Sequence, residues 1–96
     1  MPDIKDTLAL RKSTHGSFRL NAEASQTLKT TIEVHRSKSL TTYHREALHA
    51  ICAKIARIIT GDPDHADSWH DIAGYAALVE NILLKEQEPK SNDAAK

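Results

Sequence analysis

Apolar residues recur every three to four positions over residues 43–60, and this is the clearest pattern in the chain. They are Leu48, Ile51, Cys52, Ile55, Ile58 and Ile59. Such spacing places them along one side of an α-helix. Thr41 or Thr42 can cap its first turn. Gly61 stands where a left-handed residue commonly ends a helix. The pattern therefore predicts a helix over about 43–60.

Two further helices are predicted on either side. The first covers about residues 21–35, with Asn21 as its N-cap, because apolar residues recur there at helical spacing. The second follows a turn in which Pro63 cannot continue the preceding helix. Asp64 is its expected N-cap, and it should end near residue 86. Its apolar stripe is Trp69, Ile72, Ala73, Ala76, Val79 and Leu83.

The expected fold class is all-α, a small helical bundle of three main helices built on an antiparallel helical hairpin. The hairpin follows from the short link between the last two helices, and the first helix should cover its seam. Residues 1–20 are expected to form an N-terminal arm or loop, with Phe18 tucked into the core. Residues 21–86 form the helical domain. Residues 87–96 lack apolar anchors and should be a disordered tail.

Composition narrows the class of protein. The chain has 96 residues and a formal net charge of zero, which argues against a non-specific nucleic-acid binder. A single cysteine excludes an intrachain disulfide and fits a reducing, cytoplasmic setting. The sequence shows neither a signal-peptide pattern nor an apolar run of membrane-spanning length, so no membrane association is expected. So short a chain buries a modest core, which favours a homo-oligomer.

Candidate chemistry gathers at one end of the predicted hairpin. Lys54 and Arg57 lie near the end of the second helix, and Asp64, Asp67 and Asp71 lie in the turn and the start of the third. One interpretation is a lattice of salt bridges that fixes the register of the two helices. The other is a polar pocket, in which Asp67 and Asp71 hold Mg²⁺ while the two cations bind phosphate.

Neighbouring residues extend the pocket interpretation. His70 can move a proton there, and Tyr75 can direct its hydroxyl toward the polar edge. His15 belongs to a segment, residues 14–18, that is either an ordinary loop or an anion-binding loop. The candidate ligand-binding residues are thus Lys54, Arg57, Asp64, Asp67, His70, Asp71, Tyr75 and His15. No catalytic residue is assigned.

Two other motifs have competing interpretations. Glu46 and His49 have the spacing of carboxylate-bridged metal bundles, but the chain has no second copy of the motif, and solvated histidine is the default. Gly74 stands among small residues that let another helix approach closely. That helix belongs either to the same molecule or to a second copy at a dimer seam.

One run of residues resembles a family of small proteins encoded by phages and prophages. Its members carry Lys-x-x-Arg on one helix and Asp-x-Trp-x-Asp-[Ile/Leu]-Ala-Gly-Tyr-Ala on the next. The corresponding residues are Lys54, Arg57, Asp67, Trp69, Asp71, Ile72, Ala73, Gly74, Tyr75 and Ala76. The resemblance covers about residues 15–84. It carries no settled activity, and it implies the cytoplasm of a host cell.

A more distant likeness is to the all-α nucleoside-triphosphate pyrophosphatases of the MazG and dimeric dUTPase type. Those enzymes hold magnesium with paired acidic motifs, and the likeness implies Mg²⁺-dependent pyrophosphate hydrolysis. Here Asp67 and Asp71 are four residues apart instead of three, and Glu46 lacks a partner. The leading hypothesis is therefore a phage-type accessory protein that binds a nucleotide or another small phosphorylated ligand, with catalysis left open. The rival is a non-catalytic interaction module that inhibits a host enzyme or defence complex.

Overall fold

The computed structural model describes residues 4–5 and 17–89. Three long helices follow one another: α2 (Phe18–His35), α3 (Thr42–Thr60) and α4 (Ala66–Gln87). No strand occurs within the described residues, so the predicted all-α class is confirmed. None of the described helices combines the length and apolar character that crossing a bilayer requires. The expectations for His15 and for residues 90–96 lie outside the described part of the chain.

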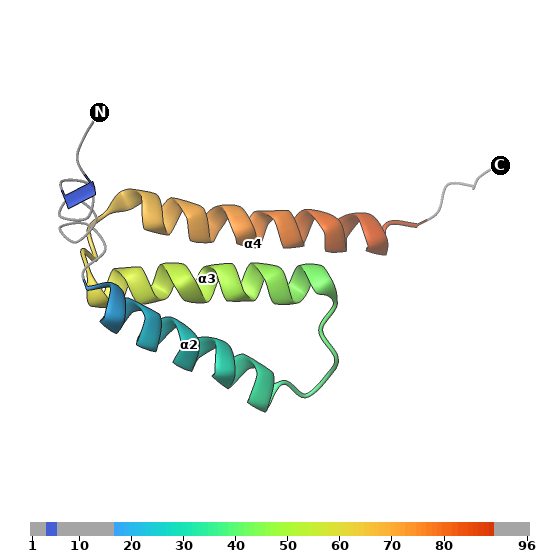
Figure 1. Cartoon of the computed structure of the whole chain (residues 1–96). Coiled ribbons are helices and arrows are strands. Elements are labelled where there is room, and N and C mark those ends of the chain that lie inside the picture. Colours follow the sequence, from blue (N-terminus) through green and yellow to red (C-terminus); the bar gives the residue numbers. More distant parts are fainter. Residues whose placement is uncertain (1–3, 6–16, 90–96) are drawn as a thin grey trace.

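The helix α3 lies between α2 and α4 and is antiparallel to both (Figure 1). Arg45 and His49 bond Glu33 of α2, whereas Lys54 bonds Asp71 of α4. At 3.6 residues per turn these contacts lie on opposite sides of α3. No Cα atom of α2 comes within 8 Å of one in α4. The expectation that the first helix covers the hairpin seam is therefore wrong, and the helices form an open layer.

The helix ends follow the prediction only in part. Thr41 caps α3, since its Oγ1 accepts the backbone N–H of His44 at 3.4 Å. In α2 the N-cap is Ser17 and not Asn21, because the N–H of Asn21 already donates to the Ser17 carbonyl at 2.9 Å. Likewise His65, not Asp64, is the N-cap of α4.

Gly61 ends α3 without the expected left-handed conformation. Its φ is −126° and its ψ −123°. Its N–H donates to the carbonyl of Arg57 at 2.9 Å, which completes the last turn of α3. The chain then turns at residues 61–65 and enters α4.

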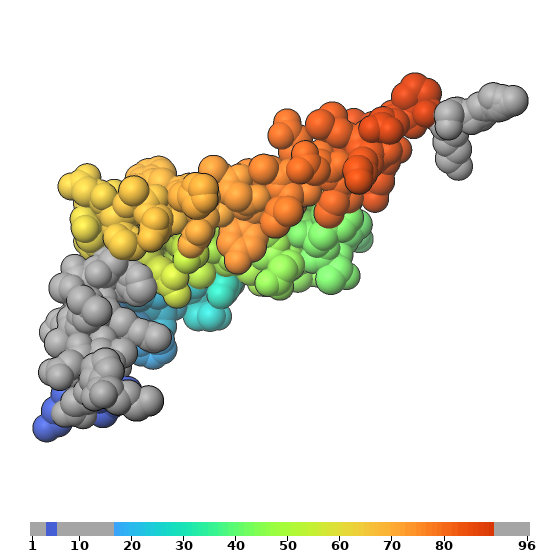
Figure 2. All heavy atoms as spheres, turned by 90° about the horizontal axis from the view of Figure 1, so that it is seen from above, coloured from blue at the N-terminus to red at the C-terminus, as the bar shows by residue number. Residues whose placement is uncertain are grey.

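The buried apolar core is small. Among the described residues it consists of Ala47, Cys52, Ala56 and Ile58, three of which are small side chains. Phe18, expected in the core, is 85% exposed, and Trp69 is 55% exposed. Seen from above, α4 covers α3 only in part, and side chains of α3 and α2 emerge along one side of α4 (Figure 2). A layer of single helices leaves much apolar surface in contact with solvent.

The two broad faces of this layer differ in character. On one flank α3 carries Leu48, Ile51 and Ile55, and on the other Glu46 and Arg57, as helical periodicity requires. On α4, Trp69, Ile72 and Ala76 lie on the same side of the layer as the apolar residues of α3, and Asp67, Asp71 and Gly74 lie on the opposite side. We call the apolar face the surface formed by Leu48, Ile51, Ile55, Trp69, Ile72 and Ala76. We call the polar face the opposite surface, with Arg57, Asp67, Asp71, Gly74 and Tyr75.

Candidate functional site

The turn at residues 61–65 sets which residues of α3 and α4 lie opposite each other. The backbone N–H of Asp64 donates to Oδ1 of Asp62 at 2.9 Å, and the indole N–H of Trp69 donates to the carbonyl of Pro63 at 2.8 Å. These bonds hold the bend from both sides. The first turns of α4 consequently lie against the last turns of α3.

Lys54 and Asp71 form the central contact of this region. Their Nζ and Oδ2 atoms are 2.7 Å apart, and the two side chains are 18% and 42% exposed. The hydrogen bond from Lys54 lowers the pKa of Asp71, and the charges of Lys54, His70 and Arg57 act in the same direction against the opposing effect of desolvation. The structure thus brings together four of the predicted side chains.

Arg57 is the cation of this group whose N–H donors are still available to a ligand. It is half-buried, and its guanidinium makes no hydrogen bond or ion pair with any other described residue. It lies close enough to Asp71 to lower the pKa of that carboxyl. A guanidinium presents several N–H donors in a planar fork that matches phosphate or carboxylate oxygens. Arg57 is therefore available to an anionic ligand.

An open hollow of about 480 Å³ adjoins these residues on the polar face. It is lined by His70, Asp71, Gly74, Tyr75 and Leu78. A Cβ atom added to Gly74 would meet no neighbour within 4 Å. The interpretation of Gly74 as a point of close helix approach within the molecule is therefore wrong, and its missing side chain widens the hollow instead.

We predict that Gly74→Ala raises the free energy of unfolding by about 1 kcal/mol, because glycine is costly inside a helix and the added methyl group meets open space. Urea denaturation measures the change. Ala73→Gly, at an exposed neighbouring position, is the matched control and should shift stability by a similar amount in the opposite direction. A less stable Gly74→Ala protein would show that the glycine is needed for the fold.

The remaining acidic candidates do not join the contact. Asp67 is exposed one helical turn before Asp71, and Asp64 is exposed in the turn. Neither side chain forms an ion pair with a described residue. Among the described residues, no group of three His, Cys, Asp or Glu side chains could hold a metal ion. Magnesium at Asp67 and Asp71 stays a prediction.

A second ionic cluster, absent from the sequence-based expectations, joins α2 to α3. Arg45 donates to both carboxylate oxygens of Glu33, with Nε–Oε2 at 3.0 Å and Nη2–Oε1 at 3.2 Å. The His49 ring lies 3.1 Å from Oε2, and Arg36 3.6 Å from Oε1. Arg45 lowers the pKa of Glu33. His49 thus pairs with Glu33 and not with Glu46. The only sequence signal was the spacing of Arg45 and His49, one helical turn apart.

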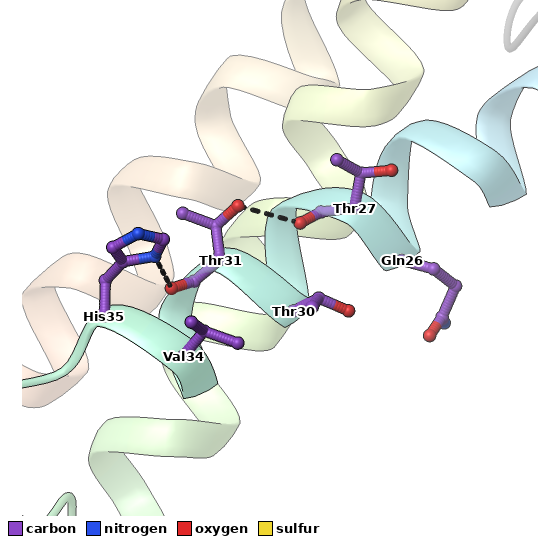
Figure 3. Close-up of a pocket in the computed structure, with 6 residues that line it drawn as sticks. All are labelled: Gln26, Thr27, Thr30, Thr31, Val34 and His35. Carbon is purple, nitrogen blue, oxygen red and sulfur yellow. Dashed lines mark hydrogen bonds between the residues drawn. The ribbon is translucent and has the colours of Figure 1, made fainter.

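Another hollow lies on α2 alone and offers little to a ligand (Figure 3). Three of its polar side chains, those of Thr27, Thr31 and His35, bond to backbone carbonyls of the helix that carries them. The Thr31 hydroxyl donates to the Thr27 carbonyl at 3.0 Å, and the His35 ring lies 3.1 Å from the Thr31 carbonyl. These groups are satisfied within the helix, so the hollow beside Asp71 is the better candidate.

The lowered pKa values of Asp71 and Glu33 predict a loss of stability in acid. A carboxyl with a lowered pKa binds protons less readily in the folded than in the unfolded chain. Its stabilisation is present above the ordinary values of 3.8 for Asp71 and 4.5 for Glu33, and is lost as the pH falls through the lowered ones. Thermal unfolding from neutral to acidic pH measures this. Asp71→Asn and Glu33→Gln should each flatten the dependence, whereas Asp64→Asn, at an exposed carboxyl, should not. An unchanged slope in both test variants would contradict the assignment.

The family to which the chain belongs is shown by sequence comparison. The model of DUF6378, a domain of unknown function, matches residues 7–83. The chain therefore belongs to the DUF6378 family, and the matched region contains α2, α3 and most of α4. No curated protein and no solved structure matches the chain significantly.

Proposed function

We propose that this protein binds a nucleotide or another small phosphorylated ligand on its polar face. The observation that supports the proposal is Arg57, a half-buried guanidinium without an ion-pair partner among the described residues, beside the Lys54–Asp71 pair and the adjoining hollow. The pair fixes the local geometry, and Arg57 supplies the donors that phosphate oxygens require. Tyr75 and His70 line the hollow and offer hydrogen bonds to the remainder of the ligand.

Charge balance explains why Mg²⁺ would accompany the ligand. The two cations, Lys54 and Arg57, are offset by the carboxylates of Asp67 and Asp71, so a phosphorylated anion would enter a site without net positive charge. Magnesium is commonly bound by one or two carboxylates together with water and substrate phosphates. Asp67 and Asp71 fit that pattern. When bound, the metal would supply polarisation of a phosphoryl group for pyrophosphate hydrolysis. Catalysis and its residues are left unassigned.

Thermal unfolding with nucleoside triphosphates, inorganic pyrophosphate and inorganic phosphate, each with and without Mg²⁺, tests the proposal. A ligand at about 100 times its Kd stabilises the fold by about 2.7 kcal/mol. We expect stabilisation by at least one phosphorylated compound, and a larger effect with Mg²⁺. The absence of any shift across the panel would contradict the proposal.

The second candidate is a phage-type interaction module that inhibits a host enzyme or defence complex in the host cytoplasm. Exposed large apolar side chains favour it, because extended apolar patches are typical of protein-binding surfaces. Two results together would support this candidate. The protein would form a defined complex with one purified host enzyme, and none of the phosphorylated compounds would raise its unfolding temperature.

A further inference from the structure

The apolar face provides a surface that the proposed ligand site does not use. Leu48, Ile51, Ala76 and Val79 line one hollow of about 520 Å³ between α3 and α4. A second hollow of about 570 Å³ lies between α2 and α3, with Leu20, Leu28 and Ile59 in its lining. On the α3 flank of this face, between Leu48 and Ile55, no charged side chain interrupts the apolar surface.

From this face we infer that two copies of the chain pack apolar face to apolar face as a two-fold dimer. The first reason is the small core, in which Ile58 is the one large aliphatic side chain among the residues that the structure describes. A layer with so little buried apolar surface needs a partner whenever it folds. A second copy of the chain is the partner that is always present at the chain's own concentration.

The size and charge of the face fit this partner. At 1.5 Å per residue, the 19 residues of α3 extend over about 28 Å, and three helices with spacings of ~10 Å are about 20 Å across. The resulting footprint of roughly 600 Å² is close to the ~800 Å² that each partner contributes to a stable interface. Among the residues that line the two hollows, Lys38 and Glu23 carry opposite charges, so the face has no excess of one charge that would repel an identical copy.

Ala76→Glu tests the dimer without disturbing the monomer, because Ala76 is exposed and glutamate is a good helix former. Ala77→Glu is the matched control, since Ala77 is also exposed but lies on the side of α4 that points away from α3. Analytical ultracentrifugation of the full chain measures the mass. We expect twice the 10.6 kDa of one chain for the wild type and for Ala77→Glu, and a lower mass for Ala76→Glu.

The unfolding temperature gives an independent readout where Ala76→Glu fails to fold. A dimer coupled to folding has an unfolding temperature that rises with protein concentration. We expect this rise for the wild type and for Ala77→Glu. A wild-type monomer at every concentration, or a dimer retained by Ala76→Glu, would overturn the inference. Loss of the dimer in Ala77→Glu alone would place the contact on the outer side of α4 and overturn it as well.

Discussion

Ile58→Ala is expected to lower the free energy of unfolding by about 2–4 kcal/mol, because it removes the one large aliphatic side chain that is buried in the described part of the chain. The lost atoms are replaced by a cavity between helices that have few other buried side chains with which to fill it. Urea denaturation at one fixed protein concentration, followed by circular dichroism, measures the effect. For a domain of this size the loss is a large fraction of the total stability.

Leu78→Ala is the matched control for that prediction. Leucine and isoleucine have the same atoms, but Leu78 is 61% exposed on the polar side of α4, away from the apolar face. Its replacement should cost well under half as much as that of Ile58. Equal losses in the two variants would mean that Ile58 is not the centre of the core.

Arg57→Ala is expected to weaken binding of the stabilising phosphorylated ligand by about 10- to 100-fold, because it removes charge-assisted hydrogen bonds to phosphate. Stability should change little, since the guanidinium makes no ion pair with another described residue. Isothermal titration in the presence of Mg²⁺ measures the affinity.

Arg19→Ala controls for the loss of one positive charge. Arg19 lies on α2 and is largely exposed, and its partner among the described residues is Glu23, one turn along the same helix. We expect its affinity to equal that of the wild type. Unchanged affinity in Arg57→Ala would remove Arg57 from the site, and an equal loss in both variants would indicate a general charge effect.

Local sequence signals predicted the helices and their hairpin well. The three-to-four spacing of apolar residues marked α3, and Thr41 capped it as expected, because both depend on residues close in the chain. The N-caps of α2 and α4 were misplaced. Asn21 is a good capping residue, yet three more residues join α2 before it, and the turn bonds of Asp62 move the start of α4 past Asp64.

Features that depend on tertiary contacts could not be derived in the same way. Periodicity identifies an apolar stripe but not the helix against which it packs. Trp69 was assigned to the apolar stripe of its helix, whereas its indole bonds the turn at Pro63 and its side chain remains half exposed. The bonds from Arg45 and His49 to Glu33 set the position of α2, and that pairing joins residues far apart in the sequence.

The juxtaposition of Lys54 and Asp71 was derivable because it needs only two antiparallel helices and a short turn between them. The state of Arg57 was not, because the same sequence pattern allows either Arg57 or Lys54 to pair with the carboxylate. The contact with Lys54 leaves Arg57 available. Because Lys54 and not Arg57 pairs with Asp71, we interpret this region as a candidate binding site and not as a lattice of salt bridges.

Amide chemical shifts recorded during a titration with Mg²⁺ and inorganic pyrophosphate test whether the polar face is the ligand site. We expect saturable shifts confined to residues 54–57 of α3 and 67–75 of α4, around the hollow on the polar face. Absence of saturable shifts, or shifts centred on the Glu33 cluster between α2 and α3, would contradict this assignment.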